Sequence, residues 1–225
     1  MFEAVILAGG KGTRLKSVSG DIPKPMVDLN GKPFLYKLME QLERYGCSSI
    51  TLSLGYRADY IIDKILKDKP VNCQVNFSVE KVPLGTGGAI KLAAEKIVGN
   101  KFLVINGDTY SEVDFSSMFK LGSKYDLVIS GVKVDDASRY GTLNVDDEGY
   151  VISMSEKGGG GAGIVNSGSY IVTKSDIMNF SKKIFSFEED YIPTIDSSFY
   201  AYITKSYFID IGIPEDYYKA CVQIK

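Results

Sequence analysis

Apolar and polar positions along the chain predict strands that alternate with helices. Short continuous apolar runs are typical of strands buried on both faces. Such runs occupy residues 4–7, 50–54, 75–79 and 102–105. Between them, apolar residues recur at helical spacing over residues 33–45, 59–66 and 89–97. Alternation of this kind predicts βαβ units and therefore a mainly parallel sheet covered by helices.

Local signals indicate where these helices begin and end. Pro33 opens the first helix and Gly46 stops it. Asp59 is placed to cap the second helix, whose apolar face includes Ile61 and Leu66.

The second half of the chain has a different pattern. Residues 126–134, 141–145 and 151–155 are typical of antiparallel strands, with a turn at 146–149. Further elements are expected at 164–172 (strand), 176–183 and 187–195 (short helices) and 207–210 (strand). Pro214 then starts a terminal helix. Because no linker or repeat interrupts the chain, we expect one domain with a small antiparallel extension.

Composition narrows the function classes. The hydrophobic share of 44% and the charged share of 24% are ordinary for a globular protein. The formal net charge of −2 argues against nucleic acid or an anionic membrane as a main partner. No apolar run approaches the length of a bilayer span, and the N-terminus lacks the layout of a signal peptide.

Two residue types limit the chemistry. Cys47, Cys73 and Cys221 are scattered and lack metal-ligand spacing, which predicts reduced, buried thiols in a cytoplasmic protein. The sequence contains no histidine, so imidazole is excluded as a base, as a nucleophile partner and as a metal ligand. Any chemistry must therefore use carboxylates, cations and backbone groups.

The first predicted strand runs into a turn that contains three glycines and two cations. These residues are Gly9, Gly10, Lys11, Gly12 and Arg14. A lysine between two prolines, Lys24, follows. Glycines let backbone N–H groups approach an anion, and the cations supply countercharge. This combination predicts a polyphosphate site.

Two better-known phosphate loops do not match this turn. The Walker A motif needs Gly-Lys-Ser/Thr, whereas Gly12 is followed by Thr13 and Arg14. The dinucleotide fingerprint needs a third glycine where Leu15 stands. A glycine-rich junction with no ligand is the alternative. The presence of Arg14 and Lys24 at the same end of the predicted sheet favours phosphate binding.

Other polar groups follow the predicted strands at the same edge, where ligands bind in open parallel sheets. Asn106 and Asp108 follow one strand and Asp210 follows the last. Two carboxylates near a phosphate loop match the oxygen preference of Mg²⁺, which usually takes substrate phosphates as further ligands. An ordinary helix cap or turn remains the alternative for each aspartate.

Glu80 and Gly85 are candidates for reading a nucleotide base. A carboxylate can accept two N–H bonds from one planar edge, and guanine offers a ring N–H beside an exocyclic amine. This favours guanine but leaves uracil and thymine open. A solvated charge at the end of a strand is the alternative for Glu80.

Signals for an acceptor substrate are weaker. Glu156 would suit sugar hydroxyls and Lys157 a phosphate, with Asn166 further along the chain. A Glu–Lys pair is also common as surface charge. The glycine run at 158–163 is typical of a flexible loop, and a lid over the sugar is the sharper hypothesis.

Taken together, these residues resemble the sugar-1-phosphate nucleotidyltransferases. The matching motifs follow the order of the family: Gly12-Thr13-Arg14-Leu15, Pro23-Lys24-Pro25-Met26, Leu84-Gly85-Thr86-Gly87-Gly88-Ala89, Asn106-Gly107-Asp108, Tyr140-Gly141-Thr142, Glu156-Lys157, Asn166-Ser167-Gly168 and 210–217. They span nearly the whole chain. Ser17 replaces a common proline and Ile213 a common threonine, but neither departure removes a charged group.

The resemblance implies both a fold and an activity. The fold is Rossmann-like α/β, with a mixed, mainly parallel sheet flanked by helices and a small antiparallel extension for the sugar. Residues 1–134 and 205–225 would form the nucleotide-binding part, and 135–204 the sugar-phosphate-binding part. The activity is transfer of a nucleoside monophosphate from a nucleoside triphosphate to a sugar 1-phosphate, with Mg²⁺ as cofactor.

The resemblance also implies roles for individual residues. Arg14 and Lys24 would be catalytic, and Asp108 and Asp210 would hold Mg²⁺. The implied nucleotide-binding residues are Leu7, Ala8, Gly9, Gly10, Gly12, Thr13, Glu80, Gly85 and Asn106. The implied sugar-phosphate-binding residues are Gly141, Glu156, Lys157 and Asn166.

Within the family, the short chain and residues 21–26 are most similar to the D-glycero-D-manno-heptose 1-phosphate guanylyltransferases. This implies GTP and a heptose 1-phosphate as substrates, in the synthesis of a capsule, lipopolysaccharide or S-layer glycan. Mannose-1-phosphate guanylyltransferases and uridylyl- or cytidylyltransferases remain open alternatives.

A non-catalytic nucleotide-sugar-binding regulatory subunit is the alternative from another class. It is disfavoured because Arg14, Lys24 and both aspartates are present. Aromatic residues near the C-terminus would suit either a homodimer interface or a core.

Overall fold

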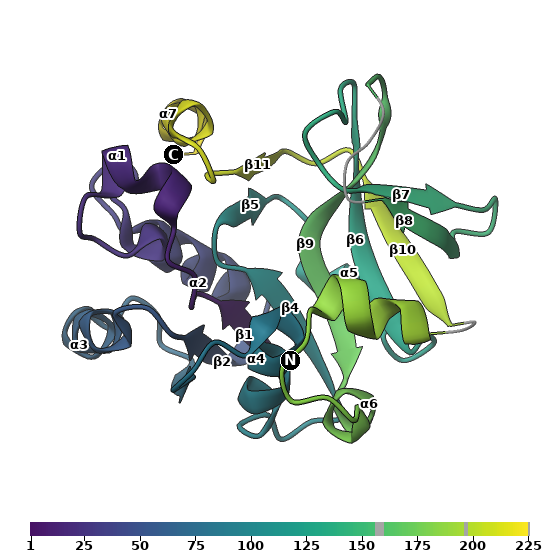
Figure 1. Cartoon of the computed structure of the whole chain (residues 1–225), viewed down its shortest axis with the longest axis horizontal. Coiled ribbons are helices and arrows are strands. Elements are labelled where there is room, and N and C mark those ends of the chain that lie inside the picture. The colour runs from purple at the N-terminus through teal and green to yellow at the C-terminus, as the bar shows by residue number, and fades with distance from the viewer. Residues whose placement is uncertain (156–159, 196–197, 225) are drawn as a thin grey trace.

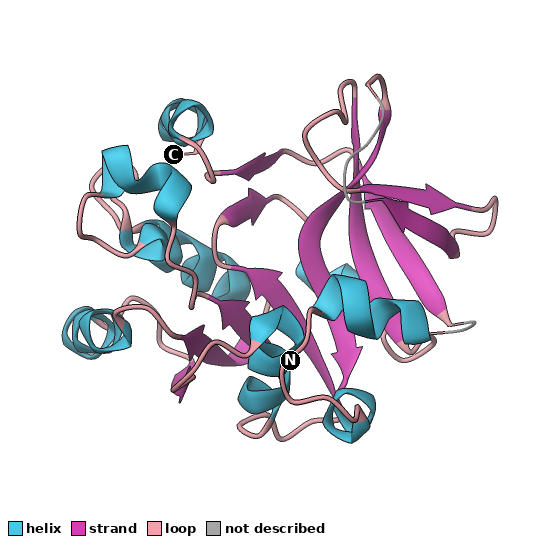
Figure 2. Cartoon of the chain, viewed as in Figure 1, coloured by secondary structure: helices cyan, strands magenta, loops and turns pink. Residues whose placement is uncertain are grey.

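The computed structural model describes residues 1–155, 160–195 and 198–224. A nine-stranded sheet forms the middle of the molecule, with helices on both faces (Figures 1 and 2). Its strands are β1 (Phe2–Leu7), β2 (Cys47–Leu54), β3 (Gln74–Val79), β4 (Lys101–Asn106), β6 (Leu127–Val134), β7 (Thr142–Val145), β8 (Val151–Ser155), β9 (Gly163–Thr173) and β10 (Phe199–Thr204).

A separate two-stranded ribbon pairs β5 (Thr109–Ser111) with β11 (Phe208–Asp210). The α-helices are α1 (Lys16–Ser19), α2 (Phe34–Arg44), α3 (Ala58–Asp68), α4 (Gly85–Ala94), α5 (Phe115–Leu121), α6 (Lys174–Asn179) and α7 (Pro214–Gln223). Short helical turns occupy Thr13–Leu15, Lys24–Met26, Phe187–Tyr191 and Ile192–Thr194.

The main sheet is mixed and mainly parallel, as predicted. Seven strands lie in the order β10-β6-β9-β4-β1-β2-β3. β3, β2, β1 and β4 run parallel, β9 runs antiparallel between β4 and β6, and β10 is parallel to β6. The antiparallel hairpin β7–β8 joins the sheet through β9 and projects away from it (Figure 1).

Alternation along each strand sends side chains to two separate cores. In β1, Ala4 and Ile6 belong to one core and Val5 to the other. Parallel strands covered on both faces have this continuous apolar character because neither face meets water. The apolar run that predicted β1 is thus explained by burial on both sides.

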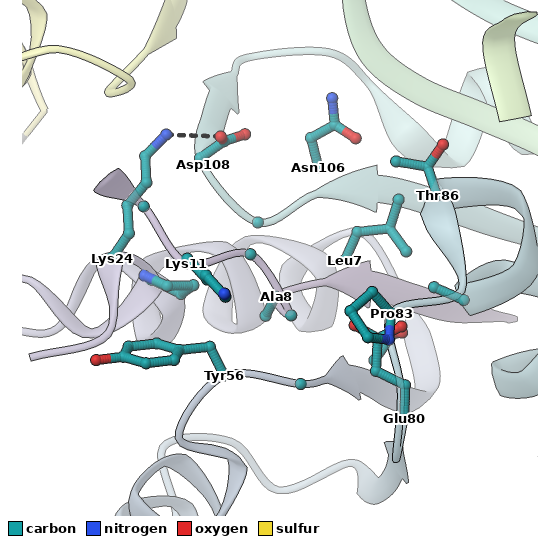
Figure 3. A pocket seen from close by; sticks show the side chains of 18 of the residues that line it. Leu7, Ala8, Lys11, Lys24, Tyr56, Glu80, Pro83, Thr86, Asn106 and Asp108 are labelled. Atoms are coloured by element: carbon teal, nitrogen blue, oxygen red, sulfur yellow. Dashed lines mark hydrogen bonds and ion pairs between the residues drawn. The ribbon is translucent and has the colours of Figure 1, made fainter. Parts of the chain in front are cut away.

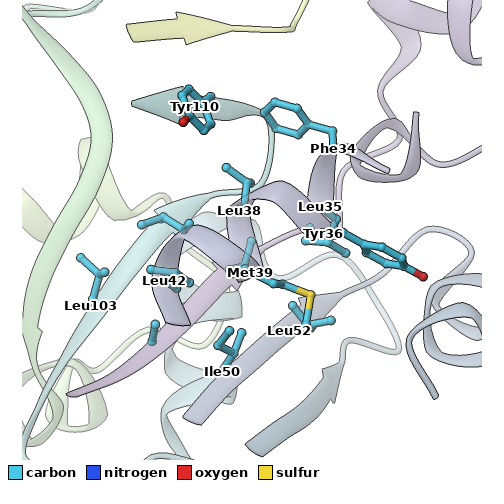
Figure 4. Packing of buried hydrophobic residues seen from close by; sticks show 14 of the residues in the cluster. Phe34, Leu35, Tyr36, Leu38, Met39, Leu42, Ile50, Leu52, Leu103 and Tyr110 are labelled. Carbon is cyan, nitrogen blue, oxygen red and sulfur yellow. The ribbon is translucent and has the colours of Figure 1, made fainter. Parts of the chain in front are cut away.

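The helix α2 covers the first of these cores (Figure 4). Phe34, Leu38 and Leu42 pack with Ile50 and Leu52 of the sheet, and all five are fully buried or nearly so. Burial of one such side chain contributes about 1.5–3 kcal/mol. This packing holds the carboxyl end of β1 in place, and that end carries the glycine-rich turn.

Several sequence predictions were wrong in detail. Asp59 does not cap α3, because Arg57 occupies the N-cap position and Asp59 lies inside the first turn. Leu66 is not on the buried face and is 59% exposed. The helix expected from residue 89 begins already at Gly85.

The largest correction concerns the last strand. β11 does not lie at the carboxyl edge of the main parallel sheet, because it pairs antiparallel with β5. Strand β10 was not predicted, and it lies parallel to β6 rather than in an antiparallel arrangement. The short elements β5 and α5 were also missed, since three to seven residues give little periodicity to detect.

Candidate active site

A cavity of about 740 Å³ opens at the carboxyl ends of β1, β2, β3 and β4 (Figure 3). We call it the glycine-loop cavity. All nine predicted nucleotide-binding residues line it, namely Leu7, Ala8, Gly9, Gly10, Gly12, Thr13, Glu80, Gly85 and Asn106. Arg14, Lys24 and Asp108 line it as well. Four segments far apart in the sequence therefore converge on one cavity, as expected for an open parallel sheet.

Backbone hydrogen bonds fix the glycine-rich turn where β1 ends. The Ala8 N–H donates to the Ser53 carbonyl at 2.8 Å, and the Gly9 carbonyl accepts from the Tyr56 N–H at 3.1 Å. Further along, Gly12 has a φ of 60°. A Cβ at Gly12 would lie 2.6 Å from the Cβ of Lys24, so a glycine is needed for this close approach.

Glu80 follows β3, and its carboxylate is held at the wall of the cavity (Figure 3). Its Oε2 accepts a hydrogen bond from the Leu84 N–H at 3.1 Å. Its Oε1 lies beside Gly9 and Gly55, and a Cβ added to Gly55 would come within 2.6 Å of that oxygen. One oxygen of Glu80 thus accepts a hydrogen bond from the backbone, and the carboxylate also lines the cavity.

Gly85 begins α4 with a φ of 73°. A Cβ at this position would overlap the Phe185 carbonyl, so only glycine fits here. The Gly87 N–H donates to the same carbonyl at 3.0 Å. The segment around Phe185 is therefore fixed against the start of α4.

Lys24, Asp108 and Asp210 form a compact charged cluster. Lys24 Nζ donates to Asp108 Oδ2 at 2.6 Å (Figure 3) and lies 3.8 Å from Asp210 Oδ1. The Lys24 side chain is 9% exposed. The β5–β11 ribbon produces this arrangement, because Asp210 pairs with Thr109 and the Ile211 N–H bonds to the Asp108 carbonyl.

The electrostatics of Asp210 suit a cation site. Burial and the neighbouring Asp108 raise the pKa of Asp210, and Lys24 counteracts them. Asp210 Oδ1 is buried and accepts no hydrogen bond from any residue that the structure describes. Such an oxygen needs a cation to offset its desolvation.

The two carboxylates fit a divalent ion only if other ligands complete the set. Within 1–155, 160–195 and 198–224, no three acidic or cysteine side chains gather closely enough to hold a metal. Mg²⁺ commonly binds through one or two carboxylates together with substrate phosphates. Asp108 and Asp210 fit that mode, in which the phosphate oxygens of a nucleotide bound in the glycine-loop cavity would complete the ligand set.

A second cavity, of about 930 Å³, lies beside the β7–β8 hairpin. We call it the hairpin cavity. The predicted residues Gly141 and Asn166 line it, together with Asp210. Arg14 and Asn106 line both cavities, so the two spaces meet at these residues. The predicted residues Glu156 and Lys157 lie outside the described residues.

An ion pair connects the wall of the hairpin cavity to α7. The Arg139 guanidinium donates to both carboxylate oxygens of Asp216, at 3.3 and 2.6 Å. Burial raises the pKa of Asp216, but hydrogen bonds from Arg139 and Lys219 outweigh it and hold that pKa below the usual value. This pair was not predictable from the sequence, because its partners are 77 residues apart.

Other lining residues had been given no binding role from the sequence. Tyr56, Pro83 and Thr86 line the glycine-loop cavity (Figure 3), and Glu188 lines the hairpin cavity. Tyr56 follows β2 at the carboxyl edge of the sheet, so the rule that found Glu80 could have found it. Glu188 does not follow a strand of the parallel sheet, so this rule does not indicate it.

The fold and the charged junction between the two cavities are typical of an α/β protein that binds phosphate groups. Comparison with known proteins shows to which family the chain belongs. The profile of the nucleotidyl transferase family matches residues 3–225. The chain therefore belongs to the nucleotidyl transferase family, as its resemblance to the sugar-1-phosphate members predicted.

Two similar relatives are described as D-glycero-alpha-D-manno-heptose 1-phosphate guanylyltransferases. The one from Campylobacter jejuni is 43% identical over 96% of this chain and 97% of its own. The one from Aneurinibacillus thermoaerophilus is 40% identical over 97% of this chain and 96% of its own. Mannose-1-phosphate guanylyltransferases are more distant, with 32% identity for a probable one from Oryza sativa over 96% of this chain and 62% of its own.

A solved structure is also very similar. HddC from Yersinia pseudotuberculosis is 59% identical, with a TM-score of 0.94 and full coverage of both chains. A second crystal structure of that protein, complexed with GMP-PN, gives a TM-score of 0.93. Both match the fold predicted from the sequence.

Among the described residues, no helix combines the length and the apolar character needed to cross a bilayer.

Proposed function

We propose that this chain is a sugar-1-phosphate guanylyltransferase. A phosphate oxygen of the sugar 1-phosphate attacks the α-phosphorus of GTP and forms a new P–O bond. The bond between the α-phosphorus and the bridging oxygen breaks, and pyrophosphate leaves with the electron pair. The products are a GDP-sugar and pyrophosphate. The similarity to heptose 1-phosphate guanylyltransferases favours D-glycero-α-D-manno-heptose 1-phosphate as the acceptor.

One observation carries this proposal: the two cavities meet at Arg14 and Asn106, beside Lys24, Asp108 and Asp210. A nucleotide in the glycine-loop cavity and an acceptor in the hairpin cavity would bring their phosphates together at this junction. Transfer then requires only positioning of the two substrates and neutralisation of charge.

The lack of histidine is compatible with this reaction. The second pKa of a phosphate is about 6, so the attacking group is already an anion near neutral pH and needs no general base. Arg14 would hold the departing β- and γ-phosphates, and Lys24 would stabilise charge on the α-phosphate. Removal of one such donor typically costs about 10²–10³ in rate.

We assign guanine recognition to Glu80. Its carboxylate lines the glycine-loop cavity close to Gly9 and Gly55. The ring N–H and the exocyclic amine of guanine form a planar pair of donors that a carboxylate can accept. The complex of HddC with GMP-PN supports a guanine nucleotide in a protein of this fold.

We assign Mg²⁺ to Asp108 and Asp210. The buried Oδ1 of Asp210, which accepts no hydrogen bond from the described residues and has Lys24 Nζ at 3.8 Å, supports this assignment. When bound, the ion would neutralise negative charge on the reacting phosphates. Around it, Lys24 and Arg14 would orient the triphosphate.

The acceptor side of the proposal rests on the hairpin cavity, which the predicted residues Gly141 and Asn166 line. Glu156 for sugar hydroxyls and Lys157 for the sugar phosphate stay predictions from the sequence, as does the division into nucleotide-binding and sugar-binding parts. A cytoplasmic location is part of the same proposal, since free thiols are typical of a reducing compartment.

Pyrophosphate release tests the proposal directly. GTP, UTP, CTP and dTTP are each combined with the 1-phosphates of D-glycero-α-D-manno-heptose, mannose and glucose, with Mg²⁺ present. We expect the GTP and heptose pair to give the highest kcat/KM. A higher value for mannose 1-phosphate would overturn the sugar assignment, and a preference for another nucleotide would overturn the role of Glu80. No release from any pair would favour a regulatory, non-catalytic protein.

A further inference from the structure

The hairpin cavity contains an acidic side chain that the proposed reaction does not yet use. Glu188 lies in the helical turn Phe187–Tyr191 and lines the cavity together with Gly141 and Asn166.

Two donors fix the Glu188 carboxylate through a single oxygen. Glu188 Oε1 accepts a hydrogen bond from Asn166 Nδ2 at 2.9 Å and another from the Tyr170 hydroxyl. Across the described part of the chain, no hydrogen bond reaches Glu188 Oε2. This oxygen therefore keeps its acceptor capacity for a ligand in the cavity.

Tyr170 and Asn166 are committed to this network. Tyr170 is 2% exposed, and burial raises its pKa well above the usual value, so the phenol stays neutral and keeps its proton to donate. Asn166 Nδ2 donates to the Tyr170 hydroxyl at 2.8 Å as well as to Glu188. Asn166 Oδ1 accepts from the Gly168 N–H at 2.8 Å. Both donors of this amide are thus already used inside the protein.

The backbone that carries Glu188 is attached to the nucleotide side of the site. The Phe187 N–H donates to Thr86 Oγ1 at 2.9 Å, and the Phe185 N–H donates to the Leu84 carbonyl at 3.0 Å. A binding group on a segment fixed in this way is held ready for its ligand, which lowers the entropy cost of binding.

Charge indicates which end of an acceptor meets Glu188. The hairpin cavity has Arg14 where it joins the glycine-loop cavity, and a phosphate is attracted there. A carboxylate repels a phosphate, but it accepts hydrogen bonds from hydroxyl groups. Glu188 therefore suits the neutral, hydroxyl-bearing part of a sugar phosphate.

We propose that Glu188 is a specificity-determining residue, whose Oε2 accepts hydrogen bonds from acceptor hydroxyls remote from the phosphate. Tyr170 and Asn166 are positioning residues that fix its carboxylate. This inference rests on the proposed function for the identity of the acceptor, although it concerns binding and needs no turnover.

Titration calorimetry tests the proposal on the full chain. The ligands are D-glycero-α-D-manno-heptose 1-phosphate and GTP, each measured with the wild-type protein and with Glu188→Gln and Glu188→Ala. Loss of a charged acceptor weakens a hydrogen bond, and loss of the whole group removes it. We expect the Kd of the heptose 1-phosphate to rise about 10-fold in Glu188→Gln and about 100-fold in Glu188→Ala. The Kd of GTP stays unchanged.

Two further variants separate direct contact from general damage. Glu148→Gln removes a carboxylate that lies in the turn of the β7–β8 hairpin and lines neither cavity, and we expect it to leave both Kd values unchanged. Tyr170→Phe removes one hydrogen bond to Glu188, and it raises the Kd of the heptose 1-phosphate without changing the Kd of GTP. A collapsed fold would instead raise both Kd values and lower the melting temperature.

Monodeoxy sugar phosphates identify the contact itself. Removal of the hydroxyl that Glu188 binds weakens binding to the wild type. The same analogue loses nothing further in Glu188→Ala, because the two changes remove one interaction. If every deoxy analogue shows additive losses, Glu188 does not contact the sugar and the proposal is wrong.

The outcomes also separate this inference from the proposed function. If the wild type releases no pyrophosphate yet binds the heptose 1-phosphate in a Glu188-dependent way, the reaction is refuted and Glu188 keeps its role. If turnover is normal and Glu188→Gln leaves the sugar-phosphate Kd unchanged, the role of Glu188 is refuted alone. If the wild type binds no sugar 1-phosphate, both are refuted.

Discussion

Lys24 occupies the space between the two carboxylates that we assign to a divalent ion. Its Nζ lies 2.6 Å from Asp108 Oδ2 and 3.8 Å from Asp210 Oδ1. An ion binding there without nucleotide must displace this ammonium group, whereas a bound triphosphate offers it another anion. We therefore expect Lys24→Met to increase the affinity of the nucleotide-free protein for Mn²⁺.

The magnitude follows from the exposure of the three groups. Lys24 Nζ and Asp210 Oδ1 are 3.8 Å apart. At an effective dielectric constant of about 20, opposite charges at this distance attract by about 4 kcal/mol, without the cost of desolvating them. The side chains of Asp108 and Asp210 are 37% and 35% exposed, so solvent screens this attraction. The free energy by which Lys24 opposes binding of the ion is then about 1–2 kcal/mol. That corresponds to a dissociation constant lower by about 5- to 30-fold.

Electron paramagnetic resonance of free Mn²⁺ measures this affinity without nucleotide. Lys32→Met is the matched control, because Lys32 forms a similar ion pair with Glu40 at 2.7 Å, outside both cavities. It should leave Mn²⁺ binding unchanged. Turnover of Lys24→Met falls by about 10²–10³ because the donor to the α-phosphate is lost. Unchanged Mn²⁺ affinity in a folded Lys24→Met protein would refute the competition that we infer.

The remaining predictions concern stability and base selectivity. Gly85→Ala forces a side chain into a left-handed conformation that costs about 1–2 kcal/mol, before its overlap with a neighbouring carbonyl. Its melting temperature therefore falls by about 2–4 °C or more, whereas Gly10→Ala, with open space around its Cβ, melts like the wild type. Asp216→Asn weakens the bonds to Arg139 and lowers the free energy of unfolding, measured in urea at pH 7, by about 1–3 kcal/mol. Because the folded-state pKa of Asp216 is lowered, its contribution is present above the ordinary value of 3.8 and is lost as pH falls through the folded-state pKa. Equal losses at pH 7 and at pH 2 would contradict this. Glu80→Gln raises KM for GTP about 10-fold and leaves KM for the sugar phosphate unchanged, since only the base loses a charged acceptor; equal effects on both would contradict the assignment.

Sequence patterns predicted the parallel half of the fold because each signal there is local. A continuous apolar run marks β1, and helical spacing marks α2. On the nucleotide side of the candidate site, the rule that ligands bind at the carboxyl ends of parallel strands indicated the glycine-rich turn, Glu80 and Asp108, and the resemblance to the family implied the remaining residues. Glu80 and Asp108 both lie where this rule places them.

Features set by long-range pairing were not predictable in the same way. Asp210 reaches Asp108 through the β5–β11 ribbon, whose strands have three residues each and are about a hundred positions apart. The segment that carries Glu188 is attached to Thr86 through the N–H of Phe187, and these two residues are 101 positions apart in the chain. Tertiary contacts of this kind leave no periodic pattern.

Anomalous scattering from Mn²⁺ tests the central claim most directly, in a crystal of this protein with its GDP-sugar product. The account predicts an Mn²⁺ peak between the carboxylates of Asp108 and Asp210, with guanine at Glu80 and the sugar in the hairpin cavity. Product bound with its diphosphate away from this aspartate pair, or Mn²⁺ held elsewhere, would contradict the account.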